Sequence, residues 1–289
     1  MGICQTMARR YRPGFSLILM SLEATLTSAA AAGKILESTH QNILALLAAS
    51  REPLYKASIE ELAAAEQWDE LNDRFFQALK FGTGGLRGRT VGKVVTKAER
   101  GNAPADQRPD HPCVGTNAMN FYNVGRATRG LVAYIKAYRA KAGLAGKPTV
   151  VFSHDTRHFS PEFAKRCAQI AIDHGADVYL FDGCRATPEM SFAVRQLRAD
   201  AGVMLTASHN PAHDNGYKVN YSDGAGIVEP HAKGIITDFG GGDRINLAAY
   251  ATTFDQLTIS VADGDTTVAV NPATTITLDN YVAGLSAID

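Results

Sequence analysis

Short apolar segments typical of strands alternate with longer amphipathic segments over residues 149–205 of this 289-residue chain. Strands are predicted at 149–152, 177–181 and 201–205, and helices at 161–174 and 188–197. Such alternation predicts an α/β fold, in which helices pack against a sheet. Ligands of these sheets bind beyond the carboxyl ends of the strands, so residues that directly follow a strand are the first candidates for a functional site.

A polar turn follows the last of these predicted strands. The run Thr206-Ala-Ser-His-Asn-Pro211 begins where the apolar segment ends, and its proline forces the chain to turn. Turns of this kind leave backbone N–H groups free to face an anion, and the lysine of Asp214-Asn-Gly-Tyr-Lys218 can balance the anion's charge. Ser208 is therefore a candidate phosphate carrier, although an ordinary surface turn uses the same residue types.

This stretch resembles the phosphoserine loop of the α-D-phosphohexomutases, the superfamily of the phosphoglucomutases and phosphomannomutases. Four more segments resemble that family and come in the family's order: Phe81-Gly-Thr-Gly-Gly-Leu-Arg-Gly88, Asp155-Thr-Arg157 with the following Phe159-Ser-Pro-Glu-Phe-Ala164, Thr187-Pro-Glu-Met-Ser-Phe192, and Gly224-Ala-Gly-Ile-Val-Glu-Pro230. The resemblance covers roughly residues 70–240 and is strongest for the long phosphoglucomutase and phosphopentomutase branch. It implies a domain I of this superfamily, with a mixed sheet covered by helices.

The resemblance also implies a chemical role for Ser208. In this family the serine carries a phosphoryl group between the 1- and 6-positions of a hexose phosphate, through a sugar bisphosphate, which makes the enzyme an isomerase of the intramolecular phosphotransferase type. Arg87 and Lys218 are the cations carried over by motif. An arginine binds phosphate oxygens with a rigid fork, whereas a lysine is a point charge that can exchange a proton when its pKa is lowered.

Three further residues are expected to contact phosphate or substrate, namely His209, Asn210 and Arg157. A general-base role for His209 is not expected, because neighbours on an extended segment point to opposite sides and His209 would point away from Ser208. Asp155 and Arg157 fit the family pattern, and they equally fit a structural ion pair at the end of a strand.

Mg²⁺ and the activator glucose 1,6-bisphosphate are the cofactors that the resemblance implies. The ion would contact the phosphate on Ser208, because transfer of a phosphoryl group requires its charge to be offset. The family's other ligands are aspartates of an Asp-Gly-Asp-x-Asp-Arg loop, and neither Gly240-Gly-Gly-Asp-Arg244 nor Asp263-Gly-Asp265 carries the required set. We therefore expect the chain to be an incomplete fragment that is inactive without the rest of its parent enzyme.

The expected organisation has three parts. Residues 1–32 are expected to be a disordered or non-native extension, and residues 33–240 a domain I that begins with a helical lead-in. Residues 241–289 are expected to be a linker and the incomplete start of a second α/β domain, with a helix beginning at Thr277.

Within the lead-in, one apolar helix face is formed by Ile35, Ile43, Leu46 and Leu47. Ser58 with Glu61 predicts a capping box at the start of a helix that continues through Trp68. Residues 99–117 are rich in Pro, Asp, Gly and Asn and predict a surface loop, and residues 120–142 predict a long helix.

Charge and cysteine content restrict the possible partners. The 29 basic and 29 acidic residues leave no net charge, which gives no electrostatic support for a nucleic-acid partner. No apolar stretch is long enough to cross a bilayer as a helix. The four cysteines lack metal-ligand spacing and are interpreted as reduced thiols of a cytoplasmic protein. The family resemblance implies a sugar phosphate as the partner.

Several functions stay open at this point. A phosphoglucomutase-like enzyme is favoured, a phosphopentomutase or phosphomannomutase is the alternative within the family, and a non-catalytic phosphosugar-binding module is the alternative outside catalysis. A serine hydrolase is disfavoured, because no Gly-x-Ser-x-Gly elbow surrounds Ser208. The preferred sugar is not predicted, since this family distinguishes sugars largely by loops that the chain does not contain.

Overall fold

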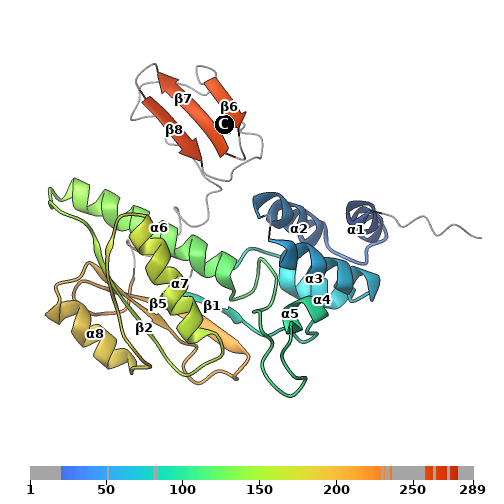
Figure 1. The fold of residues 1–289 in the computed structure, drawn as a ribbon, viewed down its shortest axis with the longest axis horizontal. Helices are drawn as coiled ribbons and strands as arrows, with labels where there is room; N and C mark the ends of the chain where they lie inside the picture. The colour runs from blue at the N-terminus through green and yellow to red at the C-terminus, as the bar shows by residue number, and fades with distance from the viewer. Residues whose placement is uncertain are drawn as a thin grey trace, which may run out of the picture.

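A five-stranded mixed sheet forms the centre of the computed structural model, which describes residues 21–50, 52–80, 84–228, 231, 235, 258–262, 265–271 and 274–278 (Figure 1). Its strands are β1 (Gly85–Arg89), β2 (Thr149–His154), β3 (Asp177–Leu180), β4 (Ala201–Leu205) and β5 (Asp214–Tyr221). The order across the sheet is β1-β5-β4-β2-β3. β2 runs parallel to β3 and β4, whereas β5 runs antiparallel to both β4 and β1. The predicted α/β fold with a mixed sheet is confirmed.

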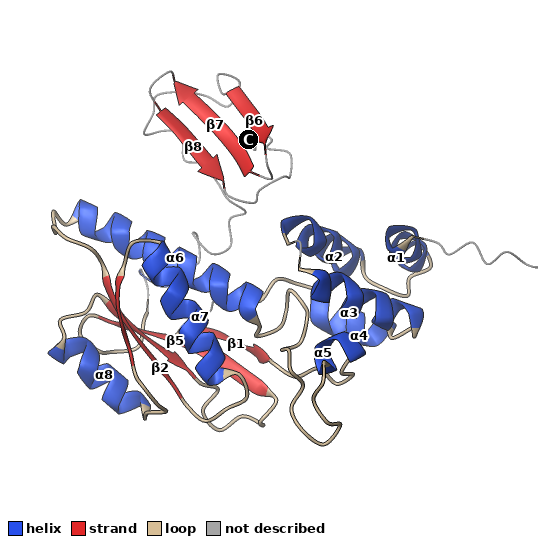
Figure 2. Cartoon of the chain, viewed as in Figure 1, coloured by secondary structure: helices blue, strands red, loops and turns tan. Residues whose placement is uncertain are grey.

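Three helices cover this sheet: α6 (Phe121–Lys141), α7 (Ser160–Asp173) and α8 (Thr187–Gln196) (Figure 2). The main core joins α6 and α7 to one face of the sheet through apolar side chains such as Leu131, Phe163 and Phe152. A smaller cluster places Met190 of α8 against Met204 of β4, so α8 covers the opposite face. The predicted strands at 149–152, 177–181 and 201–205 and the helices at 120–142, 161–174 and 188–197 therefore match observed elements within two residues.

The helical lead-in consists of α1 (Leu22–Ala31), α2 (Glu37–Ala49), α3 (Pro53–Ala64), α4 (Trp68–Phe75) and the short α5 (Lys97–Arg100). It has its own apolar cluster, in which Ile35, Ile43 and Leu46 are buried as the sequence predicted. The expected extension over residues 1–32 is wrong for α1, because Leu26 of that helix is fully buried in this cluster. Residues 1–20 lie outside the described part of the chain.

A buried ion network ties the lead-in to the segment that leads into α6. The Arg74 guanidinium donates to Glu70 at 2.8 Å and to Glu99 at 2.5 Å, and these three side chains are at most 4% exposed. Glu99 also accepts from the backbone N–H of Val114 at 2.8 Å. Charges removed from water in this way are tolerated because each is paired and hydrogen-bonded.

The capping box predicted at Ser58 and Glu61 is wrong. Ser58 lies within α3 and is fully buried, and its hydroxyl donates to Glu99 at 3.2 Å. The capping box is instead formed at the start of α5 by Thr96 and Glu99. Glu61 does bind a helix N-terminus, but it is that of α5, where it accepts from the N–H of Lys97 at 2.8 Å.

Residues 99–117 are only partly the predicted surface loop. The segment begins within α5, and its last residues before Asn117 are buried between the lead-in and the sheet. Cys113 and Val114 are at most 2% exposed, because they pack where the Arg74 network meets α6. The composition of residues 99–117 is typical of a surface loop, and it therefore did not predict that the end of this segment is buried.

A second, three-stranded antiparallel sheet contains β6 (Thr258–Ala262), β7 (Asp265–Asn271) and β8 (Thr274–Leu278). The helix expected to begin at Thr277 is wrong for Thr277 and Leu278, which lie in β8. The remaining residues of that expected helix are outside the described ranges.

No helix among the described residues combines the length and the apolar character that a membrane span requires.

Gly85 of β1 lies directly against the backbone of β5. Its φ is +133°, and a Cβ atom there would lie 1.8 Å from the carbonyl oxygen of Tyr217. Only glycine satisfies both conditions, because a side chain would be strained at that φ and would collide with backbone that cannot move aside.

We expect Gly85→Ala to lower the free energy of unfolding by more than about 2 kcal/mol, because the new methyl group separates β1 from β5. Gly84→Ala is the matched control, since Gly84 has a φ of +90° but open space around it, and it should cost about 1 kcal/mol. Urea unfolding of the 289-residue chain measures both. Equal losses would show that the close approach to Tyr217 does not matter.

Arg74→Met should lower the free energy of unfolding by about 3 kcal/mol, because it leaves the carboxylates of Glu70 and Glu99 buried without their partner. Lys56→Met is the control: Lys56 forms an exposed pair with Glu60 at 3.7 Å, and its removal should change stability by less than about 0.5 kcal/mol. Thermal unfolding followed by circular dichroism compares the two. An unchanged melting temperature in Arg74→Met would contradict the role given to the network.

Candidate active site

The candidate residues meet at one edge of the sheet, where β4 ends and β5 begins. The loop with Ser208 connects these two strands, and Asp155 and Arg157 follow the end of the neighbouring β2. β1 brings in Arg87, which lies opposite Gly216 of β5, while Lys218 lies two residues further along the same strand. Residues two apart on a strand face the same side, so Arg87 and Lys218 share one face of the sheet.

Ser208 has a left-handed backbone with a φ of +58° and is exposed. Its N–H donates to the Thr206 hydroxyl at 2.9 Å, and that hydroxyl donates to the Asp155 carboxylate at 2.5 Å. Since Ser208 and His209 form a turn, the extended segment assumed for His209 in the sequence analysis is wrong. The Ser208 hydroxyl nevertheless has no hydrogen bond to the His209 ring, and within the described residues it bonds to no other group.

Arg157 lies behind this loop and is 11% exposed. One of its terminal nitrogens donates to the carbonyls of Pro211 at 2.7 Å and Asp214 at 3.0 Å. The other donates to the carbonyl of Ser208 at 2.7 Å and to that of Asn210. Asp155 is 3.5 Å from the Arg157 Nε. Arg157 was expected to contact phosphate or substrate, and its terminal nitrogens instead bind backbone carbonyls of the Ser208 loop and of the start of β5.

Two arginines, Arg87 and Arg157, lie close enough to Lys218 to affect its pKa. Burial lowers the pKa of Lys218 below its ordinary value, the nearby Arg87 lowers it further, and Arg157 adds to this effect, whereas Asp155 opposes it. A lowered lysine pKa means that the site disfavours one more positive charge. Burial is the largest cause of this lowering, and the part due to Arg87 and Arg157 reflects a positive local potential that favours an anion.

Asn210 links this cluster to the start of β5. Arg87 donates to the Asn210 side-chain oxygen at 3.3 Å, and the Asn210 amide donates to Asp214 at 3.0 Å. The exposed His209 has no comparable link to a described side chain. Of the candidate residues outside the Ser208 loop, Arg87 and Arg157 thus form hydrogen bonds to it.

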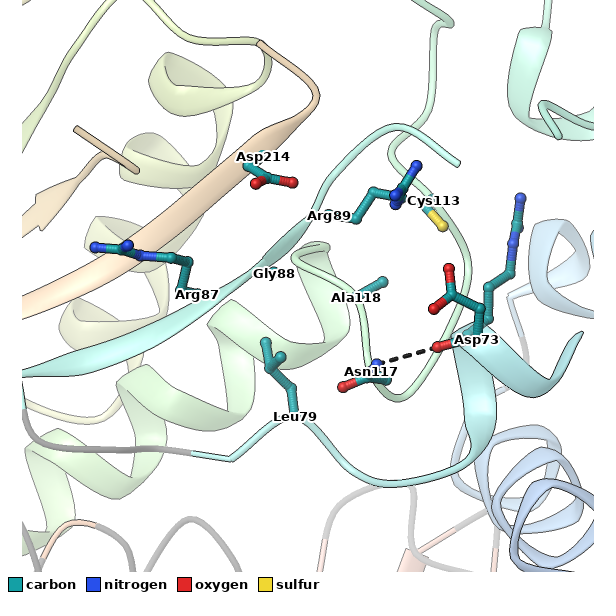
Figure 3. Close-up of a pocket in the computed structure, with 10 residues that line it drawn as sticks. Asp73, Leu79, Arg87, Gly88, Arg89, Cys113, Asn117, Ala118 and Asp214 are labelled. Carbon is teal, nitrogen blue, oxygen red and sulfur yellow. Dashed lines mark hydrogen bonds between the residues drawn. The ribbon is translucent and has the colours of Figure 1, made fainter. Parts of the chain in front are cut away.

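A cavity of about 250 Å³ opens beside Arg87, between β1 and the segment before α6. Figure 3 shows Arg87 and Arg89 extending away from each other on this part of β1, so they do not form a common clamp. The lining also includes the polar side chains of Asp214 and Asn117 and the apolar side chain of Leu79, and the Asn117 amide donates to the carbonyl of Asp73 at 3.0 Å. It extends the polar edge of the sheet beyond the Ser208 loop.

Sequence reasoning missed the role of Thr206. Its hydroxyl both accepts from the Ser208 N–H and donates to Asp155, and so connects the loop to the end of β2. A threonine two residues before a turn residue is a known pattern for such a bond, and that pattern was the available signal.

The described residues include no group of three or more His, Cys, Asp or Glu side chains that could hold a metal ion. The donor set present around Ser208 therefore does not by itself fit a Mg²⁺ site. The two aspartate segments discounted in the sequence analysis lie outside the residues whose side chains the structure describes.

Comparison with known proteins places this domain in a family. Residues 112–244 match the family described as phosphoglucomutase/phosphomannomutase, alpha/beta/alpha domain I. A phosphoglucomutase of Staphylococcus epidermidis is 38% identical over 174 residues, which are 60% of this chain and 26% of that protein. A phosphoglucomutase of Staphylococcus aureus is 35% identical over 176 residues, covering 61% of this chain and 26% of that protein.

A putative phosphomannomutase from Thermus thermophilus is a similar solved structure, with a TM-score of 0.43 and 29% identity over 56% of this chain and 30% of that chain. The family match, the identity to phosphoglucomutases and the observed sheet together define the class: the chain carries, over residues 112–244, a domain I of the phosphohexomutase superfamily. It spans about a quarter of the length of these curated relatives.

We expect Arg87→Gln to raise the pKa of Lys218 toward its ordinary 10.5, because Arg87 is the second cause of the lowering after burial. Below 10.5 the folded wild-type chain binds fewer protons at Lys218 than the unfolded chain, so stability rises as pH rises through the interval between the two pKa values. The variant should show a smaller rise.

Carbon-13 NMR of the lysine side chains over pH 7–11 follows this titration. Arg100→Gln is the control, since Arg100 bonds the carbonyls of Pro104 and Gln107 in the loop after α5. An unchanged Lys218 pKa in Arg87→Gln would contradict the proximity of the two cations.

Proposed function

We propose that this chain provides the phosphoserine domain of a phosphohexomutase of the phosphoglucomutase type, with Ser208 as the phosphoryl carrier. The observation that carries the proposal is an exposed serine hydroxyl, without a partner among the described residues, on a loop to which the Arg87 and Arg157 side chains are hydrogen-bonded. The 38% identity to a phosphoglucomutase over 174 residues supports it.

In the proposed reaction, a sugar hydroxyl attacks the phosphorus of phospho-Ser208. The bond between phosphorus and the serine oxygen breaks as a bond to the sugar oxygen forms. The sugar hydroxyl gives its proton to a base, the departing serine oxygen takes up a proton, and a sugar bisphosphate results. Transfer of the other phosphoryl group back to Ser208 then completes the exchange between the 1- and 6-positions. Positioning and charge neutralisation dominate the energetics of such a transfer.

Each neighbouring residue has a proposed part in this step. Arg87 neutralises phosphate oxygens with its guanidinium fork. Lys218 exchanges the proton or neutralises the phosphate, and its lowered pKa increases the share of the neutral, basic form at a given pH. His209 is exposed beside Ser208 and is proposed to contact the phosphate or the substrate, and Asn210 holds Arg87 in place at 3.3 Å.

The complete interconversion is proposed for the parent protein. Mg²⁺ would supply charge neutralisation at the phosphate, and glucose 1,6-bisphosphate would supply the first phosphoryl group. We derive no step through the ion, because the described residues contain no fitting set of ligands. A cytoplasmic location agrees with the free thiols of the buried Cys113 and Cys167.

The full-length parent, incubated with labelled glucose 1,6-bisphosphate, should carry phosphate on Ser208 as mapped by mass spectrometry. Ser208→Ala should lose this label and reduce turnover by at least about 10³-fold, because it removes the covalent carrier. Ser222→Ala is the control, since Ser222 is an exposed serine on the turn after β5, and it should change neither. Label at another residue, or full turnover in Ser208→Ala, would overturn the proposal.

A panel of glucose, mannose and ribose 1-phosphates in the same assay assigns the sugar. Residues 1–289 alone should turn over none of these substrates.

A further inference from the structure

Arg157 makes an unusual set of contacts for an arginine beside an expected phosphate. Its two terminal nitrogens donate to four backbone carbonyls of one loop, those of Ser208, Asn210, Pro211 and Asp214. With its side chain 11% exposed, little of the guanidinium faces solvent or ligand. These donors are already used, so Arg157 is a poor candidate for a direct phosphate ligand.

The four bonds determine where the loop's N–H groups point. In a planar trans peptide the N–H points opposite to the carbonyl of the preceding residue. The carbonyls of Ser208 and Pro211 face Arg157, so the N–H groups of His209 and Ala212 face the other way. Neither N–H donates to another described residue, whereas those of Asn210 and Asp214 donate to carbonyls inside the loop.

The same contacts oppose the strain at Ser208. A non-glycine residue with a φ of +58° costs about 1 kcal/mol or more and persists only when its surroundings hold it. Arg157 holds the Ser208 carbonyl, and the Thr206 hydroxyl, itself bound to Asp155, holds the Ser208 N–H. Both ends of the strained residue are therefore attached to the segment that follows β2.

We propose that Arg157 is a positioning residue that turns the His209 and Ala212 N–H groups toward the phosphate on Ser208, rather than a residue that binds this phosphate itself. Backbone N–H groups arranged side by side form a favourable concavity for an anion. The functional meaning of this geometry rests on the proposed phosphoserine role, but the geometry can be tested without turnover and without phosphorylation.

The test is a titration of the nitrogen-15-labelled 289-residue chain with inorganic phosphate, followed by NMR. In the wild type, the amide protons of His209 and Ala212 should move downfield in a saturable way, while those of Asn210 and Asp214, which bond within the loop, should move less. Arg157→Lys should weaken phosphate binding by about tenfold or more, because an ammonium group cannot reproduce the planar fork.

Arg139→Lys is the matched control. Arg139 also binds an aspartate, Asp200, at 2.6 Å and a backbone carbonyl, but it lies near the start of β2, at the opposite end of the strand from the site. It should leave phosphate binding unchanged. Amide shifts in β2 and β4 report whether each variant is folded.

Three results would overturn the inference: no response of His209 and Ala212 in the wild type, unchanged phosphate affinity in Arg157→Lys, or an equal loss in Arg139→Lys. If Arg157→Lys does not fold, the comparison of His209 and Ala212 with Asn210 and Asp214 in the wild type decides alone. Failure of the proposed function has a different signature, since Ser208 of the parent would then remain unlabelled while this titration behaves as described.

Discussion

The position of β5 between β4 and β1 determines where every candidate residue lies. Its antiparallel pairing with β4 makes the Ser208 loop a short connection at the edge where β2 also ends. Its pairing with β1 brings Arg87 to the same face as Lys218. Glycine permits this arrangement, because a Cβ atom at Gly216 would lie 2.5 Å from the carbonyl oxygen of Thr206, directly before the loop. The charge cluster is thus a consequence of strand pairing.

The Ser208 loop is held by side chains of the segment that follows β2. Arg157 binds its carbonyls, and Asp155 binds the Thr206 hydroxyl that receives the Ser208 N–H. Both belong to the segment after β2, so a single connection holds the serine, while Arg87 of β1 binds the same loop through Asn210. Buried groups around a loop can preorganise it before any ligand arrives, which reduces the cost of binding an anion.

The sequence predicted the parts of the fold that local patterns encode. β2, β3 and β4 and the helices α6, α7 and α8 carry apolar periodicity and were placed within two residues. The Gly85–Arg89 strand has no apolar periodicity and was not predicted. It forms by pairing with β5, which lies more than a hundred residues away in the sequence. The Ser-x-x-Glu pattern was misleading at Ser58, because this serine is buried and its hydroxyl binds Glu99 instead of capping a helix. Ser208, Arg87 and Lys218 were recognisable from motifs, whereas the carbonyl contacts of Arg157 and the role of Thr206 required the folded chain.

The central claim is that Arg87 and Lys218 stabilise a phosphate dianion on Ser208, and the most direct measurement is the second pKa of that phosphate. Phosphoserine can be incorporated at position 208 and titrated by phosphorus-31 NMR. An exposed phosphoserine titrates at about 6. We predict a pKa at least about one unit lower, because neighbouring cations favour the doubly charged form, and a shift toward 6 in Arg87→Gln. A pKa of 6 or above in the wild-type chain would contradict the account.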